Sequence, residues 1–249
     1  MDTAITIPLA ALVGIFLLAG AVKGLTGMGL PTIAMGLLGL GMPPAAAAAM
    51  LVAPSMVTNV WQLAAGPALG PLMRRLWPML LGLVVGTIAG AGALATTDPS
   101  WSGFALGLAL IGYAGHALFA PPLTVPGRQE RWWSPTVGVA TGAVTGATGV
   151  FVIPAVPYLQ ALGLQRDTLV QALGLSFTIS TLALAIGLGA HGAFRFEQAG
   201  LSALAVVPAL AGMWLGGRLR QRIPPARFRV WFLVCLLLLG LELASRPWR

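Results

Sequence analysis

The clearest feature of this 249-residue sequence is how little charge it carries. Only 8% of its residues are charged, with six acidic side chains, one lysine and two histidines, whereas soluble domains carry about 25% charged residues. A water-soluble fold is therefore not expected. The one cysteine, Cys235, lies in an apolar run, which excludes an intramolecular disulfide framework. So few ligating side chains form no metal-binding set, and we expect neither a metal nor another cofactor.

Catalytic and targeting motifs are also missing. The sequence shows no Ser-His-Asp set, no HExxH and no paired-aspartate motif in or near its apolar segments, so we do not expect an enzyme. No basic residue precedes the first apolar run, so we do not expect a cleavable signal peptide. The net charge of +8 comes from arginines in short loops, where topology and lipid headgroups explain them. Nucleic-acid binding is therefore not expected.

Long apolar runs are what the sequence does contain, with 57% hydrophobic residues and a mean hydropathy of +0.89. A helix needs about 20 residues to cross a bilayer core about 30 Å thick. We therefore predict an all-α polytopic membrane protein embedded in the lipid bilayer. Three runs of 14 residues are too short to cross, namely 28–41, 136–149 and 150–163. The longer runs are 5–23, 44–64, 77–95, 101–119, 169–190, 199–217 and 229–245.

The chain also repeats itself. "GAVKGLTG" at 20–27 returns as "GAVTGATG" at 142–149, with six of eight positions identical at an offset of 122. Further matches follow in the same order at similar offsets: Leu40-Gly41 with Leu162-Gly163, Pro78 with Pro208, Gly82 with Gly212, and Phe104 with Phe232. We predict a first membrane repeat at 1–120, a cytoplasmic linker at 121–135 and a second repeat at 136–249.

Loop charge predicts how the repeats are oriented. The loop with Arg74 and Arg75, the linker, and segment 218–229 with its five arginines are predicted to be cytoplasmic. The loop at 96–100 has one acid and no base and is predicted to be external. These assignments agree if 5–41 and 136–163 each enter and leave on one side. We therefore predict two inverted repeats, each a broken, re-entrant helical hairpin plus three transmembrane helices.

The two glycine phrases are predicted to break their helices at 24–27 and 146–149. Irregular backbone inside a bilayer survives only within protein or beside a wet cavity. The helix that follows each break would point its N-terminal amides at an anion. Lys23, the only lysine, lies beside the first break, and an ionisable group inside a membrane indicates function. The alternatives are that the glycines serve helix packing and that Lys23 snorkels to the interface.

Each break is followed by a helix with polar side chains. Ser55, Thr58, Asn59 and Gln62 are spaced to share one helix face, and Gln171, Ser176, Ser180 and Thr181 are their counterparts. Such groups can donate to an oxyanion, although they often bond one helix to another. The predicted substrate-binding residues are Lys23, Gly24, Thr26, Gly27, Asn59, Thr145, Gly146, Thr148, Gly149, Ser176 and Ser180.

At these residues the sequence resembles the sulfite exporter TauE/SafE family, also called the toluene sulfonate uptake permease family. The resemblance rests on "AGAVKGLTGMGLPTIAMGLLGLGMPPAAAAAMLVAPSMVTNVWQ" and "GAVTGATGVFVIPAVPYLQALGLQRDTLVQALGLSFTIS". Many members have consecutive glycines after the break, where this chain has "GMGLP" and "GVFVIP". The resemblance implies a permease of the bacterial inner membrane for small sulfur-containing anions such as sulfite, sulfonates or sulfoacetate.

Three alternatives to that permease stay open at this point. The first is a drug/metabolite-type carrier in which all ten apolar runs cross the membrane. The second is an accessory membrane protein that transports nothing, and the third is an intramembrane enzyme. The sequence indicates neither a coupling ion, such as a proton, nor an oligomeric state.

Overall fold

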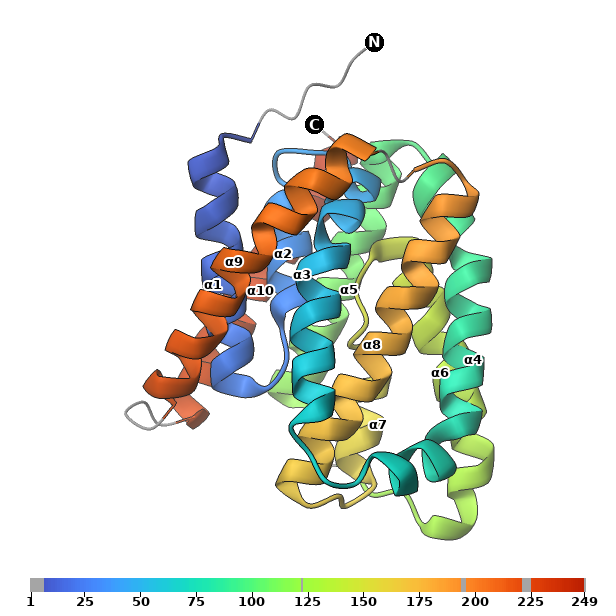
Figure 1. Cartoon of the computed structure of the whole chain (residues 1–249). Coiled ribbons are helices and arrows are strands. Elements are labelled where there is room, and N and C mark those ends of the chain that lie inside the picture. Colours follow the sequence, from blue (N-terminus) through green and yellow to red (C-terminus); the bar gives the residue numbers. More distant parts are fainter. Residues whose placement is uncertain (1–6, 122, 194–195, 221–224, 249) are drawn as a thin grey trace.

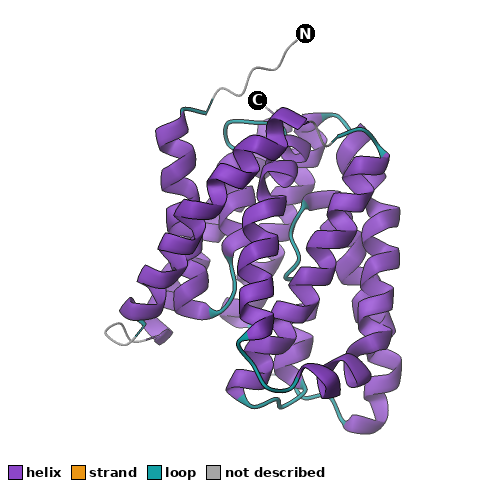
Figure 2. Cartoon of the chain, viewed as in Figure 1, coloured by secondary structure: helices purple, strands orange, loops and turns teal. Residues whose placement is uncertain are grey.

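The computed structural model describes residues 7–121, 123–193, 196–220 and 225–248. In this part of the chain it contains helices and no strand (Figures 1 and 2), which confirms the predicted all-α class. The helices are α1 (Leu9–Thr26), α2 (Leu30–Leu38), α3 (Pro44–Ala64), α4 (Leu69–Thr96), α5 (Pro99–Phe119), α6 (Gly127–Thr148), α7 (Ala155–Ala161), α8 (Arg166–Ala190), α9 (Phe196–Leu219) and α10 (Pro225–Ser245), followed by a short 3-10 helix, Arg246–Trp248. Part of the arginine-rich segment 218–229, residues 221–224, lies outside the described residues.

Seven of these helices are long and apolar enough to span a membrane: α1, α3, α4, α5, α8, α9 and α10. The chain is therefore a multi-pass membrane protein. Helices α2 and α7 have nine and seven residues, or about 14 and 10 Å of length, so neither crosses the bilayer core. Two of the three predicted short segments are thus short, and a carrier with ten complete spans is not supported.

Helix α6 differs from the prediction for 136–149. It has 22 residues and begins at Gly127, inside the predicted linker 121–135. Its first turns carry Arg128, Glu130 and Arg131, which interrupt the apolar pattern without interrupting the helix. We infer that this charged first part extends beyond the hydrocarbon core, where water or lipid headgroups solvate it.

The outer surface of the helices suits a lipid environment. On α4 the exposed residues Leu69, Met73, Trp77, Leu81 and Val85 follow one another at intervals of four. All eight tryptophans of the chain are exposed. Tryptophan is typical of the boundary between hydrocarbon and water, and apolar stripes are typical of lipid-facing helix surfaces.

Close backbone contacts hold two pairs of helices together, α1 with α9 and α4 with α6. A Cβ atom added at Gly20 would lie 2.1 Å from the carbonyl oxygen of Ala209, and one at Gly212 would lie 2.0 Å from that of Leu17. In the second pair, a Cβ atom at Gly138 would lie 2.1 Å from the carbonyl oxygen of Met79. Small residues allow membrane helices to approach this closely. Gly20, Gly138 and Gly212 therefore form helix interfaces.

The helix pairing has a symmetry that relates the first five helices to the last five. Helix α1 packs on α9 and α6 packs on α4, while α3 packs on α8 and α5 packs on α10. Exchanging α1–α5 with α6–α10, in order, turns the pair α1–α9 into the pair α6–α4. The same exchange leaves the pairs α3–α8 and α5–α10 unchanged. The pairing is what two interleaved copies of one unit would give. The opposite orientation of the two copies stays a prediction.

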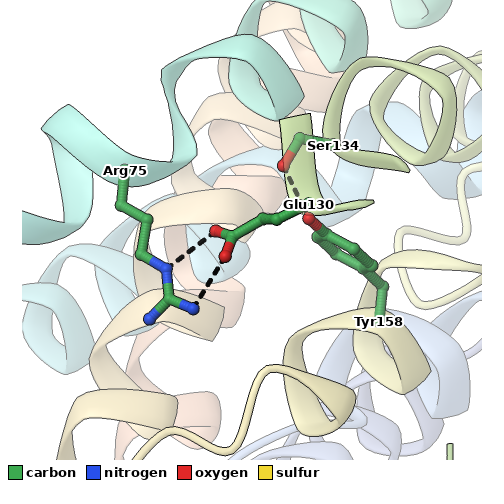
Figure 3. A network of polar contacts seen from close by, with 4 residues as sticks. All are labelled: Arg75, Glu130, Ser134 and Tyr158. Carbon is green, nitrogen blue, oxygen red and sulfur yellow. Dashed lines mark hydrogen bonds and ion pairs between the residues drawn. The ribbon is translucent and has the colours of Figure 1, made fainter. Parts of the chain in front are cut away.

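The start of α6 is tied to α4 and α7 by polar contacts (Figure 3). Arg75 donates from Nε and Nη2 to the two carboxylate oxygens of Glu130 at 2.7 and 2.8 Å. The hydroxyls of Ser134 and Tyr158 lie 2.6 Å apart. A two-pronged arginine–carboxylate pair has the strongest geometry available to an ion pair. The Arg75 side chain is nevertheless 42% exposed, so salt screens part of the attraction.

We expect Arg75→Ala to lower the free energy of unfolding by about 1 kcal/mol, because it removes a two-pronged but partly exposed ion pair. The matched control is Arg74→Ala, which removes the same charge from the preceding, exposed position and should have a smaller effect. Thermal unfolding of the purified protein in detergent, in low and high salt, measures both. Equal losses in the two variants would contradict a structural role for the pair.

Candidate functional site

Both predicted breaks are present at the glycine phrases. Helix α1 ends at Thr26 and Gly27 has a φ of +81°, while α6 ends at Thr148 and Gly149 has a φ of +72°. Glycine is the residue that adopts this left-handed conformation without steric cost. The amides of Gly27 and Gly149 each donate to the carbonyl four residues earlier, at 2.7 Å. These two amides therefore form the last hydrogen bonds of α1 and α6.

The breaks begin three residues later than the sequence indicated. Gly24 and Gly146 lie inside α1 and α6, and their missing side chains serve helix packing. A Cβ atom at Gly24 would lie 2.1 Å from the carbonyl oxygen of Met213, and one at Gly146 would lie 2.4 Å from that of Thr87. The packing explanation therefore accounts for these two glycines, and the left-handed turn accounts for Gly27 and Gly149.

The threonines of the phrases shape the turns. Thr26 donates from Oγ1 to the carbonyl of Met28 at 2.7 Å and accepts from the Met28 amide at 3.2 Å. Thr148 accepts from the Val150 amide at 3.3 Å and donates to the carbonyl of Val144 at 2.6 Å. The recurrence of Thr-Gly in both phrases thus has a structural cause, because the hydroxyl satisfies backbone groups that the end of the helix leaves free.

Lys23 is buried, with 2% of its surface exposed, so it does not snorkel to the interface. Its Nζ atom donates to the Thr58 hydroxyl at 3.1 Å and to the side-chain oxygen of Asn59. Asn59 in turn donates to the Thr181 hydroxyl at 3.2 Å. No carboxylate within the described residues forms an ion pair with Lys23. A buried ammonium group among neutral acceptors is costly, so an anion would be strongly favoured beside it.

This polar cluster joins the two predicted repeats. Asn59 and Thr181 differ by 122 positions, the offset of the glycine phrases, so their hydrogen bond joins equivalent residues of the two repeats. The same offset relates Lys23 to Thr145 and Thr58 to Ser180. The site is therefore asymmetric, with an ammonium group in one half and a hydroxyl in the other.

The structure brings only some of the predicted site residues together. Lys23 and Asn59 are in contact, and Thr58 and Thr181, which the predicted site omitted, complete their cluster. Thr145 and Ser176 are buried and donate to carbonyls of their own helices, at 2.7 and 2.9 Å. The Ser180 hydroxyl is buried and has no hydrogen-bond partner within the described residues.

Gln62 of α3 ties the first break to α8. Its Nε2 atom donates to the carbonyl of Gly27 and to the carbonyl of Val170, each at 2.8 Å. One side chain from α3 thus fixes both the turn after α1 and the first part of α8.

We expect Gln62→Leu to lower the free energy of unfolding by about 1–3 kcal/mol, because a buried carbonyl and a partly buried one lose their donor. Gln129→Leu, at an exposed position of α6, is the control and should change stability little. Thermal unfolding in detergent measures the difference. If both variants unfold at the wild-type temperature, Gln62 does not fix the break.

A cavity of about 350 Å³ opens beside the first break. Thr26 and Met28 of the break form part of its wall, and α5, α7 and α10 form most of the rest. Arg166, the first residue of α8, and Arg220, which follows α9, also line it. Thr26 is one helical turn from Lys23, so the cavity lies close to the buried cluster. The sequence did not predict this cavity, because its wall comes from segments spread between residues 25 and 233.

The positive charges of Arg166 and Arg220 repel each other. Burial lowers the pKa of Arg220, the neighbouring Arg166 lowers this pKa further, and Asp167 opposes both effects. A guanidinium group stays charged at neutral pH. The wall of the cavity therefore carries two positive charges that repel one another.

Comparison with known protein families gives a match over most of the chain. The family model described as "Sulfite exporter TauE/SafE" matches residues 12–243, which include both breaks, the buried cluster and the cavity. No curated protein and no solved structure matches the chain.

Proposed function

Because the chain belongs to the sulfite exporter TauE/SafE family, a family of membrane transporters for sulfite and other anions, we propose that it is a permease for small sulfur-containing or organic anions. The proposed substrates are of the sulfite, sulfonate and sulfoacetate class. The proposed location is the bacterial inner membrane, with the arginine-rich ends of the helices on the cytoplasmic side.

One observation carries this proposal: the only lysine of the chain is buried between membrane-spanning helices, and within the described residues no carboxylate pairs with it. An oxyanion beside Lys23 would supply the missing negative charge. Thr58 and Asn59 would hold the ammonium group in place, and the Ser180 hydroxyl, which has no partner within the described residues, would be free to donate. The first-turn amides of α2 would add further donors.

Transport by alternating access requires parts of the protein to move against one another around this site. The sequence repeat predicts that one half of the chain moves against the other, and we propose instead that the moving parts are not the two sequence repeats. The glycine interfaces join α1 to α9 and α4 to α6, so each interface joins helices of different repeats. Backbones in direct contact cannot slide past each other without losing that contact. Each glycine-packed pair therefore moves as one unit.

Uptake of labelled sulfite into liposomes that contain the purified protein tests the proposal. We expect a saturable rate of uptake, which unlabelled sulfite or sulfoacetate lowers by competition. Liposomes without the protein should show no saturable uptake. An accessory membrane protein would give no such rate. Absence of saturable uptake for sulfite, sulfonates and short carboxylates would overturn the proposed function.

A further inference from the structure

The cavity beside the first break combines an apolar wall with positive charge. Met28, Val156, Phe232 and Leu233 supply apolar surface, and Arg166 and Arg220 supply the two guanidinium groups. Arg166 is exposed and Arg220 is partly buried. Within the described residues neither arginine forms an ion pair, although Asp167 follows Arg166 directly.

We propose that this cavity is a second anion site, distinct from the Lys23 cluster, in which Arg166 and Arg220 bind the head of a small organic anion while the apolar wall holds its carbon body. The ligand class is a sulfonate or carboxylate on a short alkyl or aryl group. This inference rests on the proposed function and deepens it, because it assigns the place where a substrate binds on the arginine-rich side of the protein.

The size of the cavity supports an organic ligand. Sites for small molecules typically have volumes of about 300–1,000 Å³ and mostly apolar walls with a few polar groups. A cavity of about 350 Å³ with two arginines fits that description at its lower limit. A bare oxyanion such as sulfite would leave the apolar wall in contact with water and gain nothing from it. The cavity therefore favours an anion that carries a carbon body.

The repulsion between the two arginines supports an anionic head. Two like charges held beside one cavity raise the free energy of the empty site, and an anion between them removes that cost. Guanidinium groups also present paired N–H donors that match the oxygens of a sulfonate or carboxylate. Thr26, which also lines the cavity, lies one turn along α1 from Lys23.

Isothermal titration of the purified full-length protein in detergent, at constant ionic strength, tests this site. The probes are propane-1-sulfonate and butyrate, compared with sulfite. The background is Lys23→Met, so that the remaining binding reports the cavity alone. We expect Arg166→Gln and Arg220→Gln each to raise the Kd for propane-1-sulfonate by about tenfold or more, because each removes charge-assisted hydrogen bonds. Arg166→Lys, which keeps the charge, should retain part of the affinity.

The matched control is Arg218→Gln. Arg218 carries the same charge near the same end of α9, but it stacks on Trp214 at 4.0 Å and is not part of the cavity wall. We expect this variant to bind propane-1-sulfonate like its background. Equal losses in all three glutamine variants would overturn the site, since they would indicate only a general effect of charge. Sulfite binding as tight as propane-1-sulfonate binding would overturn it too.

The outcomes also separate this inference from the proposed function. In one outcome, liposomes that contain the wild-type protein take up no anion while Arg166→Gln and Arg220→Gln still weaken the binding of propane-1-sulfonate. In that case the proposed function fails and the second site stands. If uptake depends on Lys23 while both arginine variants bind propane-1-sulfonate like Arg218→Gln, the second site fails and the proposed function stands.

Discussion

Gly20→Ala should destabilise the protein severely, by about 3 kcal/mol, because the added methyl group has no space. Its Cβ atom would lie 2.1 Å from the carbonyl oxygen of Ala209 in α9, where real Cβ atoms are essentially never found. The obstacle is backbone, so a change of rotamer cannot relieve it. Thermal unfolding of the purified protein in detergent should show a large fall in unfolding temperature, or the variant should fail to accumulate.

The matched control is Gly14→Ala on the same helix. Apart from its chain neighbours and the backbone of its own helix, no atom lies within 4 Å of the position that its Cβ would take, and the position is exposed. Alanine in a helix interior is favoured over glycine by about 1 kcal/mol, so this variant should be as stable as wild type or slightly more stable. Similar unfolding temperatures for the two alanine variants would contradict the close packing of α1 on α9.

Much of the fold could be predicted because the lengths of the apolar runs in a membrane protein indicate which helices cross the bilayer. Uninterrupted apolar runs predicted the spanning helices, and the short runs at 28–41 and 150–163 predicted helices too short to cross. The length of α6 could not be predicted in this way. Its first part carries Arg128, Glu130 and Arg131, and hydropathy registers where a helix lies in lipid rather than where it begins.

The site could be predicted only in part, because a glycine indicates freedom of the backbone and not how that freedom is used. Gly24 and Gly27 stand in the same phrase, yet one lies against α9 and the other forms the left-handed turn. Only the partner helix distinguishes the two roles. Lys23 and Asn59 were identifiable because a charge or an amide inside a membrane needs partners. Their link to Thr181 could have been found from the offset of 122 that relates Asn59 to it.

Lys23→Met should lower the saturable rate of anion uptake by about 100-fold or more, because the variant removes a charge-assisted contact of about 3 kcal/mol from the proposed site. Methionine has a similar length and no charge, so the space between α1 and α3 stays filled. The protein should still fold, since burial of an unpaired ammonium group is itself costly. Initial rates of labelled sulfite uptake into liposomes measure the effect, and Gly14→Ala, on the same helix, controls for handling and insertion.

The most direct test of an anion path past Lys23 is therefore the ratio of saturable sulfite uptake between wild type and Lys23→Met, at equal amounts of folded protein in the liposomes. If the anion passes the buried lysine, wild type and Gly14→Ala take up sulfite at a saturable rate, and Lys23→Met is close to protein-free liposomes. Equal saturable rates in wild type and Lys23→Met would show that the anion does not pass the buried lysine, and would contradict a binding site there.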